Sequence, residues 1–475
     1  MGKSTKITKG KTESFDNTIE NGIRTIAIEV ASNRAIPSLL DGLKPVHRSI
    51  LWGMYRLGLH FNKNTTKTAK VAGEVMGKYH PHGDCSPSIV TLAQGKMKCN
   101  LAHGLGAWGD CFGAEAAASR YTEVKLSELA DVILLDPKYL EDGVTDYISN
   151  YLGDDKLPVF LPAKLPLIFT TGSQGIAFGY ATNIPTFSLK SVVRVCKLAL
   201  NQYPKKVGSK VLQKLEFDDL DNKICISSEA EIKSFMESGK GSIQFSADYT
   251  FKDKIITFTG LVGNPDTMFS KLEEDDRVYQ VNNLSSGNSI KIEVILKPSI
   301  TLKEVKAVAQ DLYKKITTRY NFNFNCIRQF VKTDKDGFKE ADAVLKETNP
   351  VDVLNEWIEW RIDLEKKMLL NQVQKTDDKV KQLQFYRYLI SKLDKIFKVL
   401  KSKTNDLKGS MQKALKCTEE QAQMVLDMPV RRLSKLSDIE LQQQIKDLKQ
   451  YASDCKKWLK KPQEKILKDL EALKF

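Results

Sequence analysis

The chain has 475 residues, 41% of them hydrophobic, so it is long enough for about three domains with packed cores and is not a disordered protein. Lysine and arginine number 73 against 59 aspartates and glutamates, an excess of 14, and the pI is near 9.1. This excess favours a polyanionic partner, either nucleic acid or a membrane surface. No apolar stretch is long enough to span a membrane, and the basic polar N-terminus lacks a signal-peptide core. We therefore expect no membrane insertion and a cytoplasmic location.

The first third of the chain predicts helices followed by a glycine-punctuated hairpin. An amphipathic helix begins near residue 15 and stops before Pro37, and the next helix has Pro45 in its first turn. Four glycines then interrupt the chain before residues 119–127, which read as a strand or wing. Such a succession favours a winged helix-turn-helix module. The four predicted helices cover residues 15–36, 44–59, 68–79 and 86–97.

The remaining two thirds of the chain divide into a part with strand-like patterns and a part with helical patterns. Apolar segments with prolines, and then segments rich in β-branched residues, predict an α/β domain reaching to about residue 335. Residues 351–403 and 436–475 read as two long helical arms, the first with at most one break, and residues 417–437 form a compact piece between them. This arrangement predicts an antiparallel coiled coil capped by a small globule.

Basic residues and histidines gather near the N-terminus. Nine lysines and arginines between residues 44 and 98 face only Glu74 and Asp84 within that window, which favours phosphate contact over a merely solvated surface. His80 and His82 flank a proline, but no third His or Cys stands at ligand spacing, so we favour hydrogen bonds to phosphate oxygens over a metal site. The nine are Lys44, Arg48, Arg56, Lys63, Lys67, Lys70, Lys78, Lys96 and Lys98.

The cysteine pattern argues against both a disulfide framework and a zinc site. There are eight cysteines without a C-x-x-C pair, so we expect free thiols. They are Cys85, Cys99, Cys111, Cys196, Cys225, Cys326, Cys417 and Cys455.

Four motifs carry a family resemblance. In chain order they are RAIPSLLDGLKPVHRSILWGMYRLGL (34–59), KVAGEVMGKYHPHGD (70–84), AAASRYTEVKLSELA (116–130) and TTGSQGIAFGYATNIPTF (170–187). Together they resemble the DNA breakage and reunion protein of bacterial type IIA topoisomerases, which is the A subunit of gyrase and of topoisomerase IV. Weaker similarity continues to QMVLDMPVRRLSKLS (423–437), which resembles the family's C-gate segment. Nearly the whole chain is covered.

The resemblance implies a multidomain α+β fold. It comprises an N-terminal tail and arm helix (1–33), a winged-helix domain with the catalytic tyrosine (34–148), an α/β tower domain (149–335), and a long antiparallel coiled coil ending in a small helical dimerisation globule (336–475).

The resemblance also implies the chemistry of the site. Tyr121 is the expected nucleophile that attacks a DNA phosphodiester and keeps the 5′ phosphate, and Arg120 is expected to stabilise charge on the phosphorus. Ile176 matches an apolar wedge that enters between bases and bends the duplex. The positions expected to grip phosphates are Arg34, Lys44, His47, His80 and His82.

Cofactors are expected on a partner. The sequence has no Walker-type phosphate loop and no acidic pair of the kind that binds the catalytic magnesium, so Mg²⁺ and ATP are assigned to a partner ATPase resembling the B subunit of gyrase or of topoisomerase IV. The expected assembly is an A₂B₂ heterotetramer around a homodimer of this chain. The chain ends at Phe475, where the predicted coiled coil finishes, and no match to the family's DNA-wrapping domain is found. We therefore expect relaxation and decatenation rather than supercoiling.

The sequence departs from the family pattern after HPHGD. Cys85 replaces the usual serine and no acidic residue follows before Gln94, while Thr171 replaces the usual asparagine. These changes predict a weak quinolone response with the cleavage chemistry intact.

Two rival functions are weighed. A tyrosine recombinase or type IB topoisomerase needs an H-x-x-R element, and none of the five histidines has one. A non-cleaving, architectural DNA-bending dimer would lose the Arg-Tyr pair, which is present.

Overall fold

A computed structural model describes residues 15–94, 100–110, 112–218, 222–286, 289–333, 335, 339–345, 347–402, 406–428 and 438–473. Within these ranges no helix is both long and apolar enough to cross a membrane. The chain divides into two compact units, residues 1–361 with 469–475, and residues 362–468. The finer boundaries predicted at 33/34, 148/149 and 335/336 stay predictions. The N-terminal tail (1–14), Lys96, Lys98, Cys99, Cys111 and residues 429–437 of the predicted C-gate segment lie outside the described residues.

The first unit begins with the helices that the hydrophobic spacing predicts. Proline at the first position of α2 is favourable because its missing N–H has no partner in a helix's first turn. Helices α2, α3 and α4 contact one another and bury their apolar faces, and α4 ends at Ala93. The elements are α1 (Phe15–Val30), the π-helical turn η1 (Ala31–Ala35), α2 (Pro45–Arg56), α3 (Thr68–Lys78) and α4 (Ser86–Ala93).

A small antiparallel sheet follows these helices, in the order β1-β3-β2. Its strands are β1 (Thr66–Lys67), β2 (Ala102–Leu105) and β3 (Glu123–Leu126). The strand predicted from residue 119 is therefore wrong at its start, because residues 119–121 form a turn in which the Tyr121 N–H bonds to the Ala118 carbonyl at 2.8 Å. Tyr121 thus precedes the strand rather than lying within it.

Two larger antiparallel sheets occupy the middle of the chain, in the orders β6-β7-β14-β9-β8 and β10-β11-β13-β12. Their strands are β6 (Ser173–Ala177), β7 (Tyr180–Ile184), β8 (Lys223–Cys225), β9 (Lys240–Ala247), β10 (Tyr249–Lys252), β11 (Ile255–Phe258), β12 (Val278–Asn283), β13 (Ile292–Leu296) and β14 (Thr318–Asn323). Two-stranded sheets are β4 (Tyr147–Ser149) with β5 (Lys156–Pro158), and β15 (Ile327–Thr333) with β16 (Lys339–Leu345). The helices are α5 (Glu128–Leu134), α6 (Ile168–Thr171), α7 (Leu189–Gln202), α8 (Ser209–Leu212), α9 (Glu229–Ser238), α10 (Pro265–Glu273) and α11 (Val305–Ile316).

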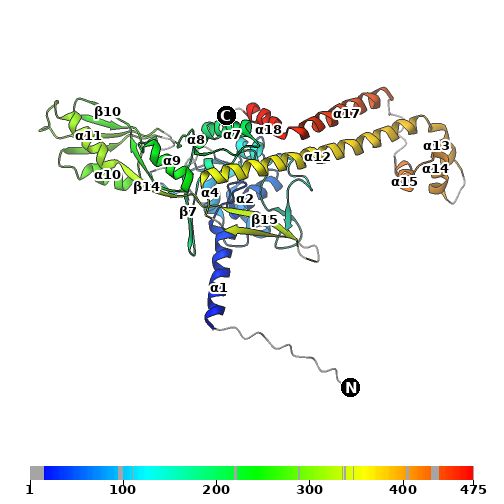
Figure 1. Cartoon of the computed structure of the whole chain (residues 1–475), viewed down its shortest axis with the longest axis horizontal. Coiled ribbons are helices and arrows are strands. Elements are labelled where there is room, and N and C mark those ends of the chain that lie inside the picture. Colours follow the sequence, from blue (N-terminus) through cyan, green and yellow to red (C-terminus); the bar gives the residue numbers. More distant parts are fainter. Residues whose placement is uncertain are drawn as a thin grey trace, which may run out of the picture. The chain divides into compact units, whose positions relative to one another are not determined.

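The second unit is helical. Helix α12 (Pro350–Ile390) starts in the first unit, and α17 (Asp438–Lys460) lies beside it (Figure 1). Ion pairs Arg387–Asp438 and Asp377–Lys456 show that the two helices run antiparallel. Residues 391–392 break the first arm as expected, whereas the second arm is also interrupted, because Pro462 starts a new helix. The other helices are α13 (Leu393–Leu400), α14 (Leu407–Leu415), α15 (Glu419–Leu426) and α18 (Pro462–Ala472).

A buried ion pair joins four segments of the first unit. The Arg48 Nε lies 2.7 Å from an Asp41 carboxylate oxygen, and side-chain exposure is 5% and 0%. The same guanidinium donates to the Gln329 side chain of β15 at 2.9 Å. Backbone N–H groups of Leu43 and Leu161 donate to the Asp41 carboxylate. Both charges are therefore hydrogen-bonded, as burial requires.

We predict that Arg48→Met lowers the free energy of unfolding by about 3–5 kcal/mol, because it leaves the Asp41 carboxylate buried without its counter-ion. Urea unfolding measures the change. Arg56→Met is the matched control, since Arg56 pairs with Asp155 at 3.1 Å but is 47% exposed, and we expect a loss within about 1 kcal/mol. Equal losses in the two variants would contradict a special role for the buried pair.

Candidate functional site

A cavity of about 860 Å³ brings together side chains that lie far apart in the sequence. It is lined by η1, the start of α2, the middle and end of α4 and the hairpin of β6 and β7. None of its described lining residues is an aspartate or glutamate. The predicted site residues that line it are Arg34, Lys44, His47 and Ile176.

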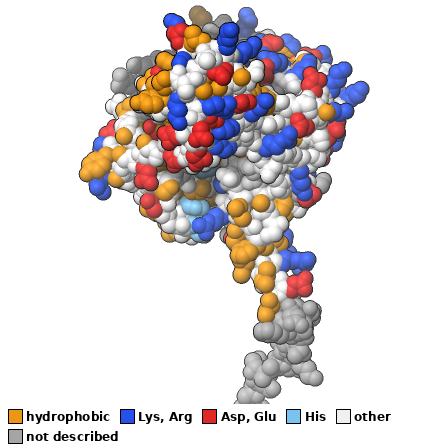
Figure 2. All heavy atoms as spheres, turned by 90° about the vertical axis from the view of Figure 1, so that its left-hand side faces the viewer, with side chains coloured by type: hydrophobic (Ala, Val, Ile, Leu, Met, Phe, Trp, Pro, Cys, Tyr) orange, Lys and Arg blue, Asp and Glu red, His pale blue; other side chains and the backbone are white. Residues whose placement is uncertain are grey.

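A second cavity, of about 160 Å³, adjoins the first because both are lined by Arg34, Val46 and Ser88. It adds His80 and His82, whose rings meet edge to face with centroids 4.9 Å apart. Six predicted site residues therefore lie around two adjoining cavities. Figure 2 shows histidine side chains beside basic and hydrophobic ones on this unit, and hydrophobic side chains along the projecting helix α1.

The β6–β7 hairpin is fixed to the body at two points. The Lys44 ammonium group donates to the Gln174 carbonyl at 2.6 Å. Gly175 lies directly against η1, where a Cβ atom would come within 2.1 Å of the Ala35 carbonyl oxygen. Any larger residue would push the hairpin off η1, so glycine at this position holds the hairpin against the segment that carries Arg34.

Burial lowers the pKa values of three basic groups at the site. Desolvation, followed by the nearby charges of Lys44, Arg48 and His80, lowers the pKa of His47 from 6.5 to about 4. Burial also lowers the pKa of His80, with smaller contributions from His82 and Arg34, and burial lowers that of Lys44. His47 is therefore a neutral hydrogen-bonding group near pH 7, in a place where a bound anion would restore its charge.

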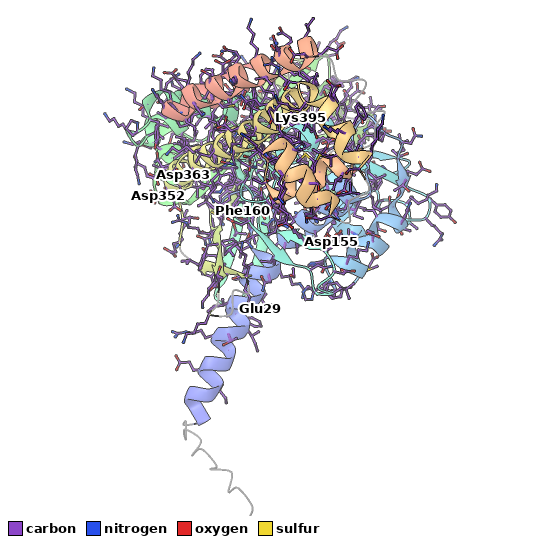
Figure 3. The ribbon with its side chains drawn as sticks, turned by 90° about the vertical axis from the view of Figure 1, so that its right-hand side faces the viewer. Glu29, Asp155, Phe160, Asp352, Asp363 and Lys395 are labelled. Carbon is purple, nitrogen blue, oxygen red and sulfur yellow. The ribbon has the colours of Figure 1, made fainter. Side chains whose placement is uncertain are left out.

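The end of α3 positions His80. The Tyr79 hydroxyl donates to Asp155 at 2.7 Å, and the same carboxylate pairs with Arg56. Figure 3 labels Asp155. Burial, and then the bond to Asp155, raises the pKa of Tyr79, so this phenol stays neutral and keeps its proton in the bond. The His80 N–H bonds to the Val75 carbonyl at 2.8 Å, which closes the helix immediately before the histidine pair.

The segment after HPHGD is held by local contacts. Asp84 accepts from the backbone N–H and hydroxyl of Ser86 at 2.9 and 2.8 Å, which gives the first N–H of α4 a partner. Cys85 is buried, with its thiol 3.8 Å from the Ala72 carbonyl, and burial raises its pKa to about 11. It is therefore a packing residue rather than an accessible thiol, and the weak quinolone response stays a prediction.

Tyr121 lies on a separate exposed turn. The carbonyls of Ser119 and Thr122 accept from the backbone N–H groups of Ala69 and Thr68. These two N–H groups lie in the first turn of α3, where they have no partner within the helix. Between these anchors the Tyr121 side chain is 65% exposed, and the Arg120 guanidinium stands over its ring at 4.7 Å from the centroid. Neither of these two residues is among the described residues that line the two cavities. The monomer thus presents the Arg-Tyr pair and the basic cavities as two separate features.

The structure corrects the count of available basic residues. Seven of the nine basic residues are described, and four of these seven are paired with carboxylates. Three of the four carboxylates, Asp41, Glu123 and Asp155, lie outside the 44–98 window. Arg48 in particular is buried and cannot reach a ligand phosphate. The basic excess predicted from the window is therefore smaller than the sequence suggests. The pairs are Arg48–Asp41, Arg56–Asp155, Lys67–Glu123 and Lys78–Glu74.

The hairpin exposes its apolar tip. Ile176 is 81% exposed, so it is not the core isoleucine that an apolar run ordinarily contains. The sequence interpretation missed three other residues of this region, Gln174 and Asn183 in the cavity lining and the exposed Phe178 at the turn. Strand alternation around Ile176 could have found Gln174, which is two residues away on the same face.

Within the described ranges, no group of three or more His, Cys, Asp or Glu side chains could hold a metal ion. None of the described cysteines forms a disulfide; they are Cys85, Cys196, Cys225, Cys326, Cys417 and Cys455.

Comparison with known proteins places this site in a family. Residues 34–471 match the family model of the DNA gyrase/topoisomerase IV A subunit. The chain is 29% identical to the A subunit of DNA gyrase from Staphylococcus epidermidis over 464 residues, covering 94% of this chain and 49% of that protein. It is likewise 29% identical to the A subunit of DNA gyrase from Staphylococcus aureus strain MRSA252, covering 94% and 50%. The chain spans about half the length of these relatives.

We predict that His47→Gln makes the free energy of unfolding less dependent on pH between pH 6.5 and pH 4. The unfolded chain takes up a proton near pH 6.5 and the folded chain only near pH 4, so His47 lowers the free energy of unfolding as pH falls between these values. The loss reaches up to about 3 kcal/mol at pH 4. Urea unfolding at several pH values measures it. His103→Gln, at an exposed site on β2, should keep the parent's slope, and an unchanged slope in His47→Gln would disprove the assignment.

Proposed function

Because the chain belongs to the family of DNA gyrase/topoisomerase IV A subunits, we propose that it is the DNA-cleaving component of a type IIA topoisomerase. In this proposal it makes a transient double-strand break, allows a second duplex to pass, and reseals the first. The observation that carries the proposal is the exposed Arg120–Tyr121 pair on a turn anchored to α3.

The proposal assigns a role to each part of the fold. Helices α2 to α4 with the β1-β3-β2 sheet act as a winged-helix domain, and the two larger sheets act as the tower. The antiparallel pair α12 and α17 forms the coiled coil, and α13 to α15 form the dimerisation globule. The antiparallel ion pairs and the shared apolar core of α12, α14, α15 and α17 support this last assignment.

The proposed chemistry is reversible phosphoryl transfer. The Tyr121 oxygen attacks the phosphorus of a phosphodiester and loses its proton, the bond to the 3′ oxygen breaks, and that oxygen is protonated. The 5′ phosphate remains on the tyrosine. A phenol is a good leaving group when the 3′ hydroxyl returns, so cleavage is close to isoenergetic and can be reversed. Arg120 is placed to stabilise negative charge on the reacting phosphate, because its guanidinium already stands beside the phenol.

The cavities are proposed to receive the DNA backbone. Arg34 is exposed, while Lys44, His47 and His80 are partly buried around cavities that have few carboxylates. Phosphate oxygens would supply hydrogen-bond partners and negative charge to His47, His80 and His82. Ile176, at the tip of a hairpin fixed by Lys44 and Gly175, is proposed to enter between base pairs and bend the duplex.

The remaining components are assigned to a partner. We propose that Mg²⁺ and ATP are bound by a partner ATPase of the gyrase B or topoisomerase IV B type, and that two copies of each chain form an A₂B₂ assembly in the bacterial cytoplasm. In this division Tyr121 and Arg120 of this chain act directly on the phosphate that is transferred.

We predict that Tyr121→Phe abolishes covalent attachment to DNA and leaves DNA affinity unchanged, because only the nucleophilic oxygen is removed. Detergent trapping of the assembly on labelled DNA measures attachment, and a gel shift measures affinity. Tyr279→Phe is the matched control, since Tyr279 on β12 is 69% exposed and should react normally. Covalent complex in Tyr121→Phe would refute the nucleophile, and its absence from the unmodified protein would indicate an architectural DNA-bending dimer.

We predict that the reconstituted assembly relaxes supercoils and unlinks catenanes when ATP is added. Strand passage alone yields both products, whereas net negative supercoiling also requires the passed segment to be wrapped with one handedness. Relaxed plasmid, supercoiled plasmid and catenated circles are incubated side by side, with the Tyr121→Phe assembly as control. Negatively supercoiled product from relaxed plasmid would contradict the predicted preference.

A further inference from the structure

The tip of the β6–β7 hairpin carries a second exposed apolar side chain. Phe178 and Gly179 form the turn between the two strands, and Gly179 has a positive φ of 70°. Phe178 is 65% exposed, two residues beyond Ile176, which is 81% exposed. A single exposed hydrophobic residue is ordinary, but two of them at one rigid tip indicate a contact surface.

The two faces of the hairpin differ. Along β6 exposure alternates, with Ser173, Gly175 and Ala177 partly covered and Gln174 and Ile176 exposed. The covered face packs on η1, because Gly175 lies against Ala35 and Ala177 joins the small core there. Phe178 lies in the turn just beyond β6 and, like Ile176, is exposed rather than packed on η1.

The chemistry around the hairpin indicates which partner the tip meets. The root of the hairpin, residues 173–175 of β6 and 183–184 of β7, lines the cavity that also contains Arg34, Lys44 and His47. No carboxylate is among the described residues that line this cavity. Lys44 bonds to the hairpin backbone itself. An apolar protein partner does not need this basic surround, whereas a duplex presents phosphates to the root and stacked bases to the tip.

We propose that Phe178 is a second DNA-distorting side chain, which stacks on a base beside the step opened by Ile176. This inference rests on the proposed function and extends it. An isoleucine can separate two base pairs but offers no flat surface, whereas a phenylalanine ring covers the face of a base that the opened step exposes. The bent duplex is then held by stacking as well as by the wedge.

The test uses the full chain assembled with its ATPase partner and a short duplex. Fluorescent dyes at the two ends report bending, and 2-aminopurine placed on either side of the scissile bonds reports unstacking. We expect Phe178→Ala to reduce affinity for the bent duplex roughly tenfold, the loss of one base-stacking contact, and to reduce bending and 2-aminopurine fluorescence. The melting temperature should not change, because the side chain is exposed.

Three further variants make the result specific. Phe178→Trp keeps an aromatic face and should restore bending, so rescue separates stacking from simple bulk. Ile176→Ala should lose bending by itself, and the double variant should lose more than either single change. Phe251→Ala removes a 45% exposed phenylalanine from β10, in a different sheet, and should behave as the parent protein does.

The outcomes separate the inference from the function on which it rests. If Phe178→Ala bends and cleaves DNA as the parent does, the inference is overturned and the proposed function stands. If the variant weakens association between the protein chains while the assembled complex bends DNA normally, Phe178 is a protein contact and the inference is also overturned. If the parent protein itself neither bends DNA nor forms a covalent complex, the proposed function fails first.

Discussion

The buried pair of Asp41 and Arg48 is the constraint on which the proposed DNA site depends. It joins the turn before α2, the first turns of α2, the Leu161 segment and β15 through hydrogen bonds from both charged groups. Lys44 lies in the same segment, between Asp41 and Arg48, and donates to the Gln174 carbonyl of the hairpin. A hydrophobic replacement of equal volume could match the stability of such a pair but not its directional contacts. The pair is better understood as a positioning device than as a source of stability.

A second consequence of this packing is electrostatic. The site assembles Arg34, Lys44, His47 and His80 with few carboxylates, and burial responds by lowering the pKa values of the last three. The lowered pKa values limit the charge of the site and avoid the full cost of burying several cations together. A bound phosphate reverses the balance, because a nearby anion favours the protonated imidazole. Proton uptake on binding therefore follows from the same burial that destabilises the protein in acid.

Sequence patterns predicted the local structure well and the long-range contacts poorly. The helix containing Pro45 and the exposed arginine-tyrosine pair could be predicted because spacing, proline and motif are local signals, whereas the break at residues 391–392 was not located by the sequence. The sequence could not show that Arg48 is buried against Asp41, since nothing in a basic window distinguishes a paired arginine from a free one. It also missed Phe178, because apolar residues in a strand usually indicate a core. The lowered pKa of His47 depends on its burial in the folded chain and has no local signal at all.

In the proposed complex, the exposed apolar tip of the β6–β7 hairpin separates stacked bases of DNA. A wedge that separates stacked bases experiences an equal force in return, so a mobile tip would be displaced instead of the DNA. Here the root is held by the Lys44 bond and by the close contact of Gly175 with η1, while the tip residues are exposed. In the proposed complex, phosphate contacts of the basic groups beside the base of the hairpin would supply the free energy for bending. In that proposal one short hairpin couples binding to distortion, and a larger residue at Gly175 would separate the two without changing either the basic side chains or the tip.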